Sequence, residues 1–282
     1  MIALIINIPD SVERLKLITT QCKNKKIPHI VVEGVVGNNL YKPDYRYRQG
    51  LELGILEEKL RPTYFMDKKN FQCYSKVQDK IMPKVGCFLS HIKAVRLAYT
   101  LKLKSVLILE DDIKFDDQLL EQLKKYEGIE RDIVYVGGHS KELPEKICGT
   151  EINCNDFKLY GTYGYYLPSQ KAIKKLLQAF QGSFKPGKKK LKIRNPSGDI
   201  RMLMAIDKYY MKFFHSNCIC IYPPLVVHNE DLDSTIDNSK KYKKRYGNKC
   251  ISKLSYNMGK SKESTLSGSI GDPQENITLL VE

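Results

Sequence analysis

The chain has 282 residues, of which 42% are hydrophobic and 28% are charged. This length suffices for one large α/β domain with a substantial core, and the composition is too apolar for a disordered chain. No stretch approaches the roughly 20 apolar residues that cross a bilayer. The apolar run at residues 1–6 also lacks the basic start and cleavage site of a signal peptide. We therefore expect a cytoplasmic protein.

The net charge of +15 arises largely from two lysine-rich clusters, at residues 185–194 and 240–245. Such clusters attract polyanions, which include nucleic acids, anionic lipid headgroups and phosphorylated glycans. A solvated surface of a lysine-rich protein explains them equally well. No recognised nucleic-acid motif is present, so we expect no specific nucleic-acid partner. Peripheral contact with an anionic membrane or glycolipid is compatible with the charge.

The eight cysteines are scattered along the chain, and none forms a CxxC pair. This spacing favours buried free thiols over a zinc site. Cys218 and Cys220 alternate in a run that is typical of a strand. We therefore expect both to lie on one face of a sheet as small core residues.

The first third of the chain alternates strand and helix signals. Residues 3–8 are continuously apolar, which predicts a strand buried on both faces. Asp10 or Ser11 then caps a helix over residues 12–23. A second strand is predicted at 30–36. Residues 38–80 are polar and tyrosine-rich, which indicates an irregular insertion with short helices.

The same alternation continues through the centre of the chain. The expected elements are a helix over 88–101, strands over 105–109, 133–136 and 163–167, a helix over 169–180, a helix over 199–214 and a strand over 218–222. A basic loop at 183–197 separates two of these helices, and residues 252–282 have the composition of a flexible or docking tail. The pattern predicts an α/β fold with a mostly parallel sheet, helices on both faces and sites at the carboxyl ends of strands.

Three consecutive carboxylates, Glu110, Asp111 and Asp112, follow the apolar strand in the segment VLILEDDIKF. Like charges this close raise one another's pKa unless a cation neutralises them. Mg²⁺ or Mn²⁺, held by one or two carboxylates, would leave positions open for substrate phosphates. Extended geometry would turn Glu110 and Asp112 to one side, as the pair that binds the metal, and Asp111 to the other. An acidic loop or the first turn of a helix would contain the same triplet.

Six segments of the chain resemble glycosyltransferase family 25 in their order. They are residues 6–15 (INIPDSVERL), 86–98 (GCFLSHIKAVRLA), 106–113 (VLILEDDI), 161–177 (GTYGYYLPSQKAIKKLL), 206–214 (IDKYYMKFF) and 221–236 (IYPPLVVHNEDLDSTI). The family includes lipooligosaccharide galactosyltransferases and collagen hydroxylysine galactosyltransferases. The ordered set is far more specific than any one of its members.

The resemblance implies a GT-A-like, Rossmann-type fold and makes residues 1–251 a glycosyltransferase domain. It also implies metal-dependent transfer of a hexose from a UDP-sugar, with inversion at the anomeric carbon. Galactose is the first choice of sugar and glucose the second. The acceptor would be a hydroxyl group on a glycan or a hydroxylysine, and the basic loop suits an anionic acceptor.

Residue roles near the donor also follow from the resemblance. Asn7 and Arg14 would lie near the nucleotide. Ser90 and His91, at a helix start, would hydrogen-bond the diphosphate or the acceptor. From the residues alone, His91 is equally well explained as a partly buried histidine of that helix.

The acidic segment would complete the donor site. Glu110 would approach the ribose or a metal-bound water, and Asp112 would bind the cation, with Asp111 beside them. His228 stands where relatives often have glutamine, so it could supply a nitrogen ligand to the metal or hydrogen-bond the acceptor.

Inverting transfer needs a general base for the acceptor hydroxyl. Asp207 is the first candidate because it matches the family's aspartate before an aromatic-rich helix. Asp199 follows a glycine and is the alternative. An N-cap or a surface salt bridge would explain either residue without catalysis.

Two functions of other classes compete with a glycosyltransferase. One is a catalytically silent glycan-binding protein on the same fold, which the retained carboxylates disfavour. The other is a nucleic-acid-binding protein, for which the charge and the 18 tyrosines are suitable. The tyrosines are not interleaved with basic residues along one strand, which disfavours it.

Overall fold

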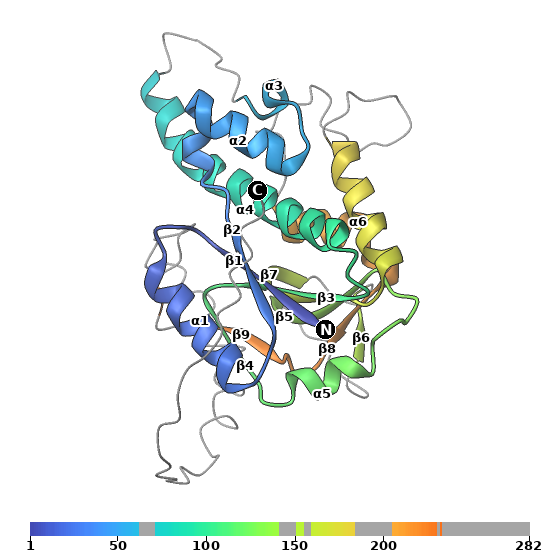
Figure 1. Cartoon of the computed structure of the whole chain (residues 1–282). Helices are drawn as coiled ribbons and strands as arrows, with labels where there is room; N and C mark the ends of the chain where they lie inside the picture. The colour runs from blue at the N-terminus through green and yellow to red at the C-terminus, as the bar shows by residue number, and fades with distance from the viewer. Residues whose placement is uncertain (62–70, 141–150, 155–158, 184–204, 230–231, 233–282) are drawn as a thin grey trace.

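The computed structural model describes residues 1–61, 71–140, 151–154, 159–183, 205–229 and 232 (Figure 1). Several parts of the sequence interpretation lie outside these residues. They are the alternative base Asp199, the basic clusters at 185–194 and 240–245, and the tail at 252–282.

Nine strands of the described residues form one sheet. They are β1 (Ile2–Asn7), β2 (His29–Glu33), β3 (Val106–Glu110), β4 (Ile113–Phe115), β5 (Ile133–Ser140), β6 (Glu151–Asn153), β7 (Leu159–Leu167), β8 (Cys218–Ile221) and β9 (Val226–His228). Their order is β2-β1-β3-β7-β5-β8-β6, and β9 pairs with β4 and β5. The three-residue strands β4, β6 and β9 are too short to show a periodicity in the sequence, and they were not expected.

The sheet combines parallel and antiparallel pairs. Strand β1 runs parallel to β2 and β3, and β5 runs parallel to β8 and β9. Strand β7 lies antiparallel between β3 and β5. The expected α/β, Rossmann-type fold is confirmed, with a mixed sheet. Because β7 is reversed, its amino-terminal half lies at the same edge as the carboxyl ends of β1 and β3.

Helices cover both faces of the sheet, as expected (Figure 1). They are α1 (Val12–Asn24), η1 (Gly37–Tyr41), α2 (Pro43–Leu53), α3 (Glu57–Leu60), α4 (Phe71–Thr100), α5 (Leu119–Lys124), α6 (Gln170–Ser183), α7 (Ile206–Phe213) and η3 (His215–Asn217). Alternate side chains of β1 enter two separate cores. Leu4 and Ile6 pack in the core that includes residues of α4 and α6, and Ala3 and Ile5 pack in the core that includes residues of α1 and α5.

Helix α4 differs most from the sequence expectation, because it begins at Phe71 and not near residue 88. It contains Pro83, which removes one helical hydrogen bond and normally ends or bends a helix. Around this residue, Met82, Val85 and Phe88 are all buried. Their packing offsets the local cost of the proline. The segment 38–80 contains η1, α2, α3 and the first turns of α4, which agrees with the expected short helices.

Helix α4 approaches the chain after β2 at two glycines. A Cβ at Gly86 would collide with the carbonyl of Val35 and the backbone of Gly37. A Cβ at Gly37 would collide in turn with the carbonyl of Met82. The absence of side chains at both positions therefore sets how closely α4 packs against the end of β2.

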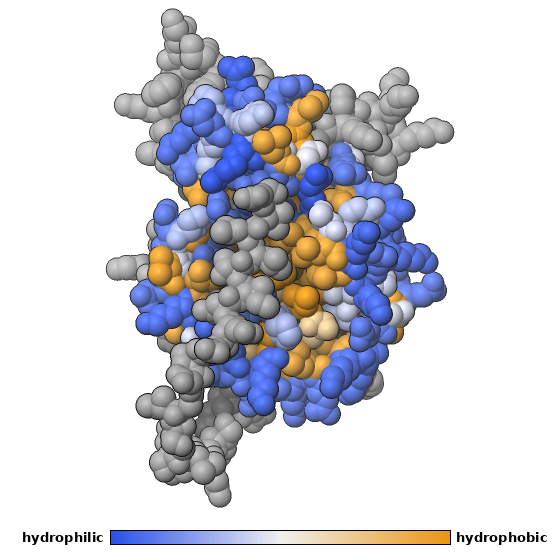
Figure 2. All heavy atoms as spheres, viewed as in Figure 1, coloured by the Kyte–Doolittle hydropathy of each residue, from blue (hydrophilic) through white to orange (hydrophobic). Residues whose placement is uncertain are grey.

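The prediction for the two cysteines of β8 is confirmed. Cys218 and Cys220 are buried in the core on one face of β8, and both are free thiols. In the face of the molecule that Figure 2 shows, hydrophilic residues rim the described part and apolar residues gather near its centre. Among the helices that the structure describes, none combines the length and apolar character of a membrane-spanning segment.

Candidate active site

The candidate site lies where β1 and β3 end. Ile6 pairs with Glu110 across these two strands, so Asn7 and Asp111 follow at the same edge. On the other side of β3, Leu109 pairs with Gly164 of β7. The carboxyl ends of two parallel strands and the beginning of β7 thus meet, as the rule for open α/β sheets leads one to expect.

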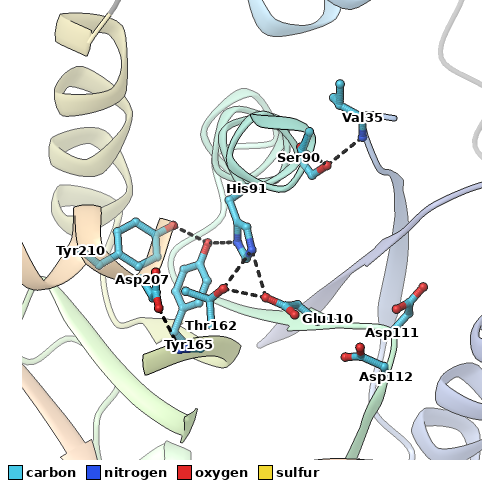
Figure 3. A network of polar contacts seen from close by, with 12 residues as sticks. Val35, Ser90, His91, Glu110, Asp111, Asp112, Thr162, Tyr165, Asp207 and Tyr210 are labelled. Atoms are coloured by element: carbon cyan, nitrogen blue, oxygen red, sulfur yellow. Dashed lines mark hydrogen bonds and ion pairs between the residues drawn. The ribbon is translucent and has the colours of Figure 1, made fainter. Parts of the chain in front are cut away.

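The acidic segment does not stay extended. Pairing of β3 ends at Glu110, and the chain bends at Asp111 and Asp112 before β4 begins. Asp111 and Asp112 therefore turn to the same side, and Glu110 turns to the other (Figure 3). The alternation expected from extended geometry is wrong at this point, because pairing of β3 with β1 ends at Glu110 and the chain bends before β4.

Arg14 of α1 joins the two aspartates. Its Nη1 lies 3.1 Å from Asp111 Oδ1 and 3.3 Å from Asp112 Oδ2, and all three residues are buried. Asn7 donates through Nδ2 to Asp111 Oδ2 at 2.7 Å and to the carbonyl of Ser11 at 3.1 Å. The end of β1 and the first turns of α1 are thereby tied to the acidic segment.

Despite these partners, the surroundings of Asp111 disfavour the charged form of its carboxyl group. Burial and the neighbouring charge of Asp112 raise the pKa of its carboxyl group to about 6. Arg14 and Asn7 act in the opposite direction by stabilising the carboxylate. One guanidinium thus does not balance two adjacent buried carboxylates, and added positive charge here would be stabilising.

His228, at the end of β9, lies against Asp112. Its Nε2 is 3.3 Å from Asp112 Oδ2, and the backbone N–H of Asn229 donates to the Asp112 carbonyl at 2.7 Å. Burial lowers the pKa of His228, but the hydrogen bond to Asp112 and the charges of Asp112 and Glu110 outweigh it, so the pKa is raised overall. Strand β4 pairs with β9, with Ile113 opposite His228, which places the imidazole beside the bend.

Two buried polar atoms in this group have no hydrogen-bond partner. They are Arg14 Nη2 and Asp112 Oδ1. Native proteins rarely leave such atoms unpaired unless a ligand, ion or water completes them. Asn7, Arg14, Asp111, Asp112 and His228 form what we call the arginine side of the site.

Glu110 belongs to a different group of residues. Thr162 of β7 donates to its Oε1 at 2.6 Å, and His91 Nε2 lies 3.4 Å from the same oxygen. His91 Nε2 is also 3.3 Å from Thr162 Oγ1. This triangle closes the space between α4, β3 and β7 (Figure 3).

Two buried tyrosines extend the contacts of His91. Its Nδ1 lies 3.0 Å from the Tyr165 hydroxyl, which accepts a hydrogen bond from Tyr210 at 2.8 Å. Both ring nitrogens of His91 therefore have polar partners, and which one carries the proton depends on the tautomer. His91, Glu110, Thr162, Tyr165 and Tyr210 form the tyrosine side.

Ser90 does not point to either side. Its hydroxyl donates to the Gly86 carbonyl at 2.8 Å and accepts from the backbone N–H of Val35 at 2.7 Å. The residue joins α4 to the chain after β2. Its position supports packing of α4, and the side chain is turned away from the carboxylates (Figure 3).

Asp207 lies in the first turn of α7, next to the start of β7. Its Oδ2 accepts from the backbone N–H of Gly161 at 3.2 Å, and its Oδ1 accepts from the N–H of Lys208 at 2.7 Å. The side chain is partly exposed. It lies near the tyrosine side, because Tyr210 follows it by one turn on α7 (Figure 3).

Sequence reasoning assigned no role to Thr162, Tyr165, Tyr210 or Cys87. The one local sign of a role for Thr162 was that it is a polar residue within an aromatic strand. The two tyrosines were indistinguishable from core residues, because their contact depends on α7 packing against β7. Cys87 stands one helical turn before His91, a spacing that a search for ligand pairs would have found.

The comparisons with known proteins identify the class. The model of glycosyltransferase family 25, described as LPS biosynthesis protein, matches residues 1–186. This match covers well over half of the chain. The chain belongs to glycosyltransferase family 25.

A particular relative carries the same family name. It is a "Glycosyltransferase 25 family member" of Drosophila pseudoobscura pseudoobscura, 36% identical over 106 residues. The match spans 34% of this chain and 16% of the fly protein. Among solved structures, the chain is similar to A197 from STIV, with 15% identity, a TM-score of 0.31, and coverage of 78% of this chain and 81% of that one. That likeness is too distant to inform function.

Proposed function

We propose that this protein is a metal-dependent, inverting glycosyltransferase that moves a hexose from a UDP-sugar to an acceptor hydroxyl group. Membership of family 25 supports the reaction class. The observation that carries the metal-dependent part is the buried Asp112 carboxylate, with one unpaired oxygen and with His228 beside the other.

The donor set fits a small divalent cation. Asp112 supplies carboxylate oxygens and His228 an imidazole nitrogen, and Mn²⁺ and Mg²⁺ both accept oxygen ligands, with Mn²⁺ more tolerant of nitrogen. Asp112 Oδ1 is buried without a partner and is available as a ligand. Two buried carboxylates, Asp111 and Asp112, share the single guanidinium of Arg14, so the local charge also favours a cation. When bound, such a cation stabilises the negative charge that develops on the departing diphosphate.

The remaining residues of the arginine side would orient the nucleotide. Arg14 is held by two carboxylates, which fixes its guanidinium and leaves Nη2 as a free donor. A phosphate or ribose oxygen would complete this donor. Asn7 would act mainly on Asp111, since its amide N–H groups are already used. Glu110 would contact the ribose or a metal-bound water only if it left Thr162.

Asp207 is the proposed general base. Two backbone N–H groups orient its carboxylate, and its side chain stays partly exposed to an incoming acceptor. In an inverting transfer the base removes the proton of the acceptor hydroxyl as that oxygen attacks the anomeric carbon. Asp199 is the alternative base and lies outside the described residues.

Membership of the family suggests the substrate classes. The donor sugar would be galactose, with glucose as the second candidate, and the acceptor a glycan or a hydroxylysine side chain. The lysine-rich residues 185–194 make an anionic acceptor or an anionic membrane surface a suitable partner.

The first test is UDP release from a panel of UDP-sugars with Mn²⁺, with Mg²⁺ and with EDTA. We expect slow, metal-dependent hydrolysis of one donor, which would define both the reaction and the sugar. Asp112→Asn should lose this signal, because an amide is a neutral and weaker ligand.

Asp117→Asn is the matched control. Asp117 lies five residues further on, pairs with Lys25, and has a side chain that is 87% exposed. It should release UDP at the wild-type rate. Release that EDTA leaves unchanged, or that Asp112→Asn retains, would contradict the metal-dependent mechanism.

A further inference from the structure

A second group of metal-binding side chains lies on the tyrosine side. Cys87 and His91 are one turn apart on α4, so they project from the same face of the helix. Glu110 faces them from the end of β3. One donor atom from each of the three residues lies within 4.8 Å of the other two.

The spacing suits tetrahedral coordination. Bonds of about 2.0–2.1 Å to nitrogen and oxygen and about 2.3 Å to sulfur place neighbouring donors roughly 3.3–3.6 Å apart. His91 Nε2 and Glu110 Oε1 are already 3.4 Å apart. The Cys87 sulfur lies within 4.8 Å of a donor atom of each of these two residues, and coordination would bring it to roughly 3.6 Å from them. Thr162 Oγ1 adjoins both of the other donors and could keep a hydrogen bond to Glu110.

The orientation of His91 is fixed in the way typical of a metal ligand. When Nε2 binds a cation, the ring proton lies on Nδ1, and the Tyr165 hydroxyl 3.0 Å away can accept it; Nε2 already lies 3.4 Å from Glu110 Oε1. Tyr210 in turn holds Tyr165. Ligating histidines generally have such a partner on the second nitrogen, which sets the ring and the tautomer.

The electrostatic environment also favours a cation. Burial, and then the charges of Glu110, Asp207 and Asp112, raise the pKa of the Cys87 thiol well above its ordinary value. Without a cation this cysteine is therefore a neutral thiol and a poor nucleophile. The same carboxylates attract a divalent cation, and a coordinating thiol loses its proton to the solvent on binding.

We propose that Cys87, His91 and Glu110 form a binding site for a thiophilic divalent cation, with Zn²⁺ as the first candidate. A sulfur, a nitrogen and one oxygen match the preferences of Zn²⁺, whereas Asp112 and His228 offer the harder donors that suit Mn²⁺ or Mg²⁺. The two sites share no ligand.

The site has a consequence that rests on the proposed function. Glu110 would be held by Zn²⁺ and could not turn toward the donor. Zn²⁺ would then inhibit transfer in the presence of saturating Mn²⁺, and the inhibition would require Cys87.

Absorption spectroscopy of the full chain with Co²⁺ tests the binding directly. We expect one equivalent of Co²⁺ to give intense visible bands of a tetrahedral ion and a thiolate-to-cobalt band in the near ultraviolet. Zn²⁺ should displace both. Cys87→Ser should lose the thiolate band, and Tyr165→Phe should weaken Zn²⁺ binding about 10–100-fold, as loss of an outer partner does.

Cys22→Ser is the matched control. Cys22 is a fully buried free thiol on α1, in the core on the opposite face of the sheet. It should keep the thiolate band, as should Asp112→Asn. Circular dichroism identifies any variant that fails to fold. A band that persists in folded Cys87→Ser, or that never appears in the folded wild type, overturns the site.

The test of the Zn²⁺ site and the test of the proposed transferase can give different results. A thiolate–cobalt band without any UDP release would leave the Zn²⁺ site standing and contradict the transferase. Mn²⁺-dependent UDP release without the band would support the transferase and contradict the Zn²⁺ site.

Discussion

The arginine side and the tyrosine side begin at adjacent residues of one chain, yet their polar groups are satisfied very differently. On the arginine side, buried Arg14 Nη2 and Asp112 Oδ1 have no partner. On the tyrosine side, Glu110, Thr162, His91, Tyr165 and Tyr210 form a continuous run of hydrogen bonds. A group left unpaired at the cost of desolvation is where a ligand is expected. The comparison therefore predicts donor binding on the first side and, on the second, a preorganised set of side chains in which a cation would replace existing hydrogen bonds.

The largest effect that would sharpen this comparison concerns Asp207. We expect Asp207→Asn to lower kcat by about 10²–10⁴, the usual range for loss of a general base. Donor affinity should be unchanged, because Asp207 contacts α7 and β7 and not the arginine side. Equilibrium binding of UDP with Mn²⁺ and steady-state transfer measure the two quantities. A variant with near-wild-type kcat would move the role to Asp199.

A smaller effect concerns the pH dependence of stability on the arginine side. The pKa of Asp111 is raised from its ordinary 3.8 to about 6. Between these pH values the folded protein holds a proton that the unfolded chain has released. Asp111 therefore lowers the free energy of unfolding as the pH rises through this window, by up to about 3 kcal/mol at 1.36 kcal/mol for each pH unit.

Urea unfolding at pH 4 and pH 7, without added cation, measures this contribution. Asp111→Asn is the comparison, because it keeps the shape of the side chain and cannot ionise. The variant should lose less stability than the wild type over the interval. Equal losses would show that the arginine side tolerates its charge without a ligand, and the contrast between the two sides would fail.

The smallest expected effect lies on the tyrosine side. Tyr210→Phe removes the donor to Tyr165 and should lower the free energy of unfolding by about 1 kcal/mol. Tyr135→Phe is a matched control, since the buried Tyr135 hydroxyl has no hydrogen-bond partner, and its removal should be neutral or stabilising. Both variants should bind Mn²⁺ as the wild type does. A loss of Mn²⁺ affinity in Tyr210→Phe would show that the two sides are coupled.

The sequence was informative where chemistry follows local pattern. The apolar strands, the helix after Pro9 and the carboxylates at a strand end are all legible from neighbouring residues, and they bring Asn7, Asp111 and Asp112 to one edge. Placing Arg14 and His228 beside Asp112 required the family resemblance, because α1 and β9 are both distant in the chain from the acidic segment.

The rest depended on tertiary structure. The direction in which Glu110 points follows from the end of strand pairing, which residue alternation does not reveal. Ser90 adjoins His91 in sequence but faces the chain after β2, because one helical position turns a side chain by about 100°. The partners of His91 come from β7 and α7, and the reversed direction of β7 has no local signal.

The close approach of Gly37 and Gly86 makes substitutions at these two distant positions depend on each other. A side chain at Gly86 would require the backbone at Val35 and Gly37 to move, and a side chain at Gly37 would require the backbone of α4 at Met82 to move. Cys87, Ser90 and His91 follow Gly86 within two turns, and any such shift would move all three. A relative that lacks this pair of glycines should therefore hold the residues of its tyrosine side in altered positions as well.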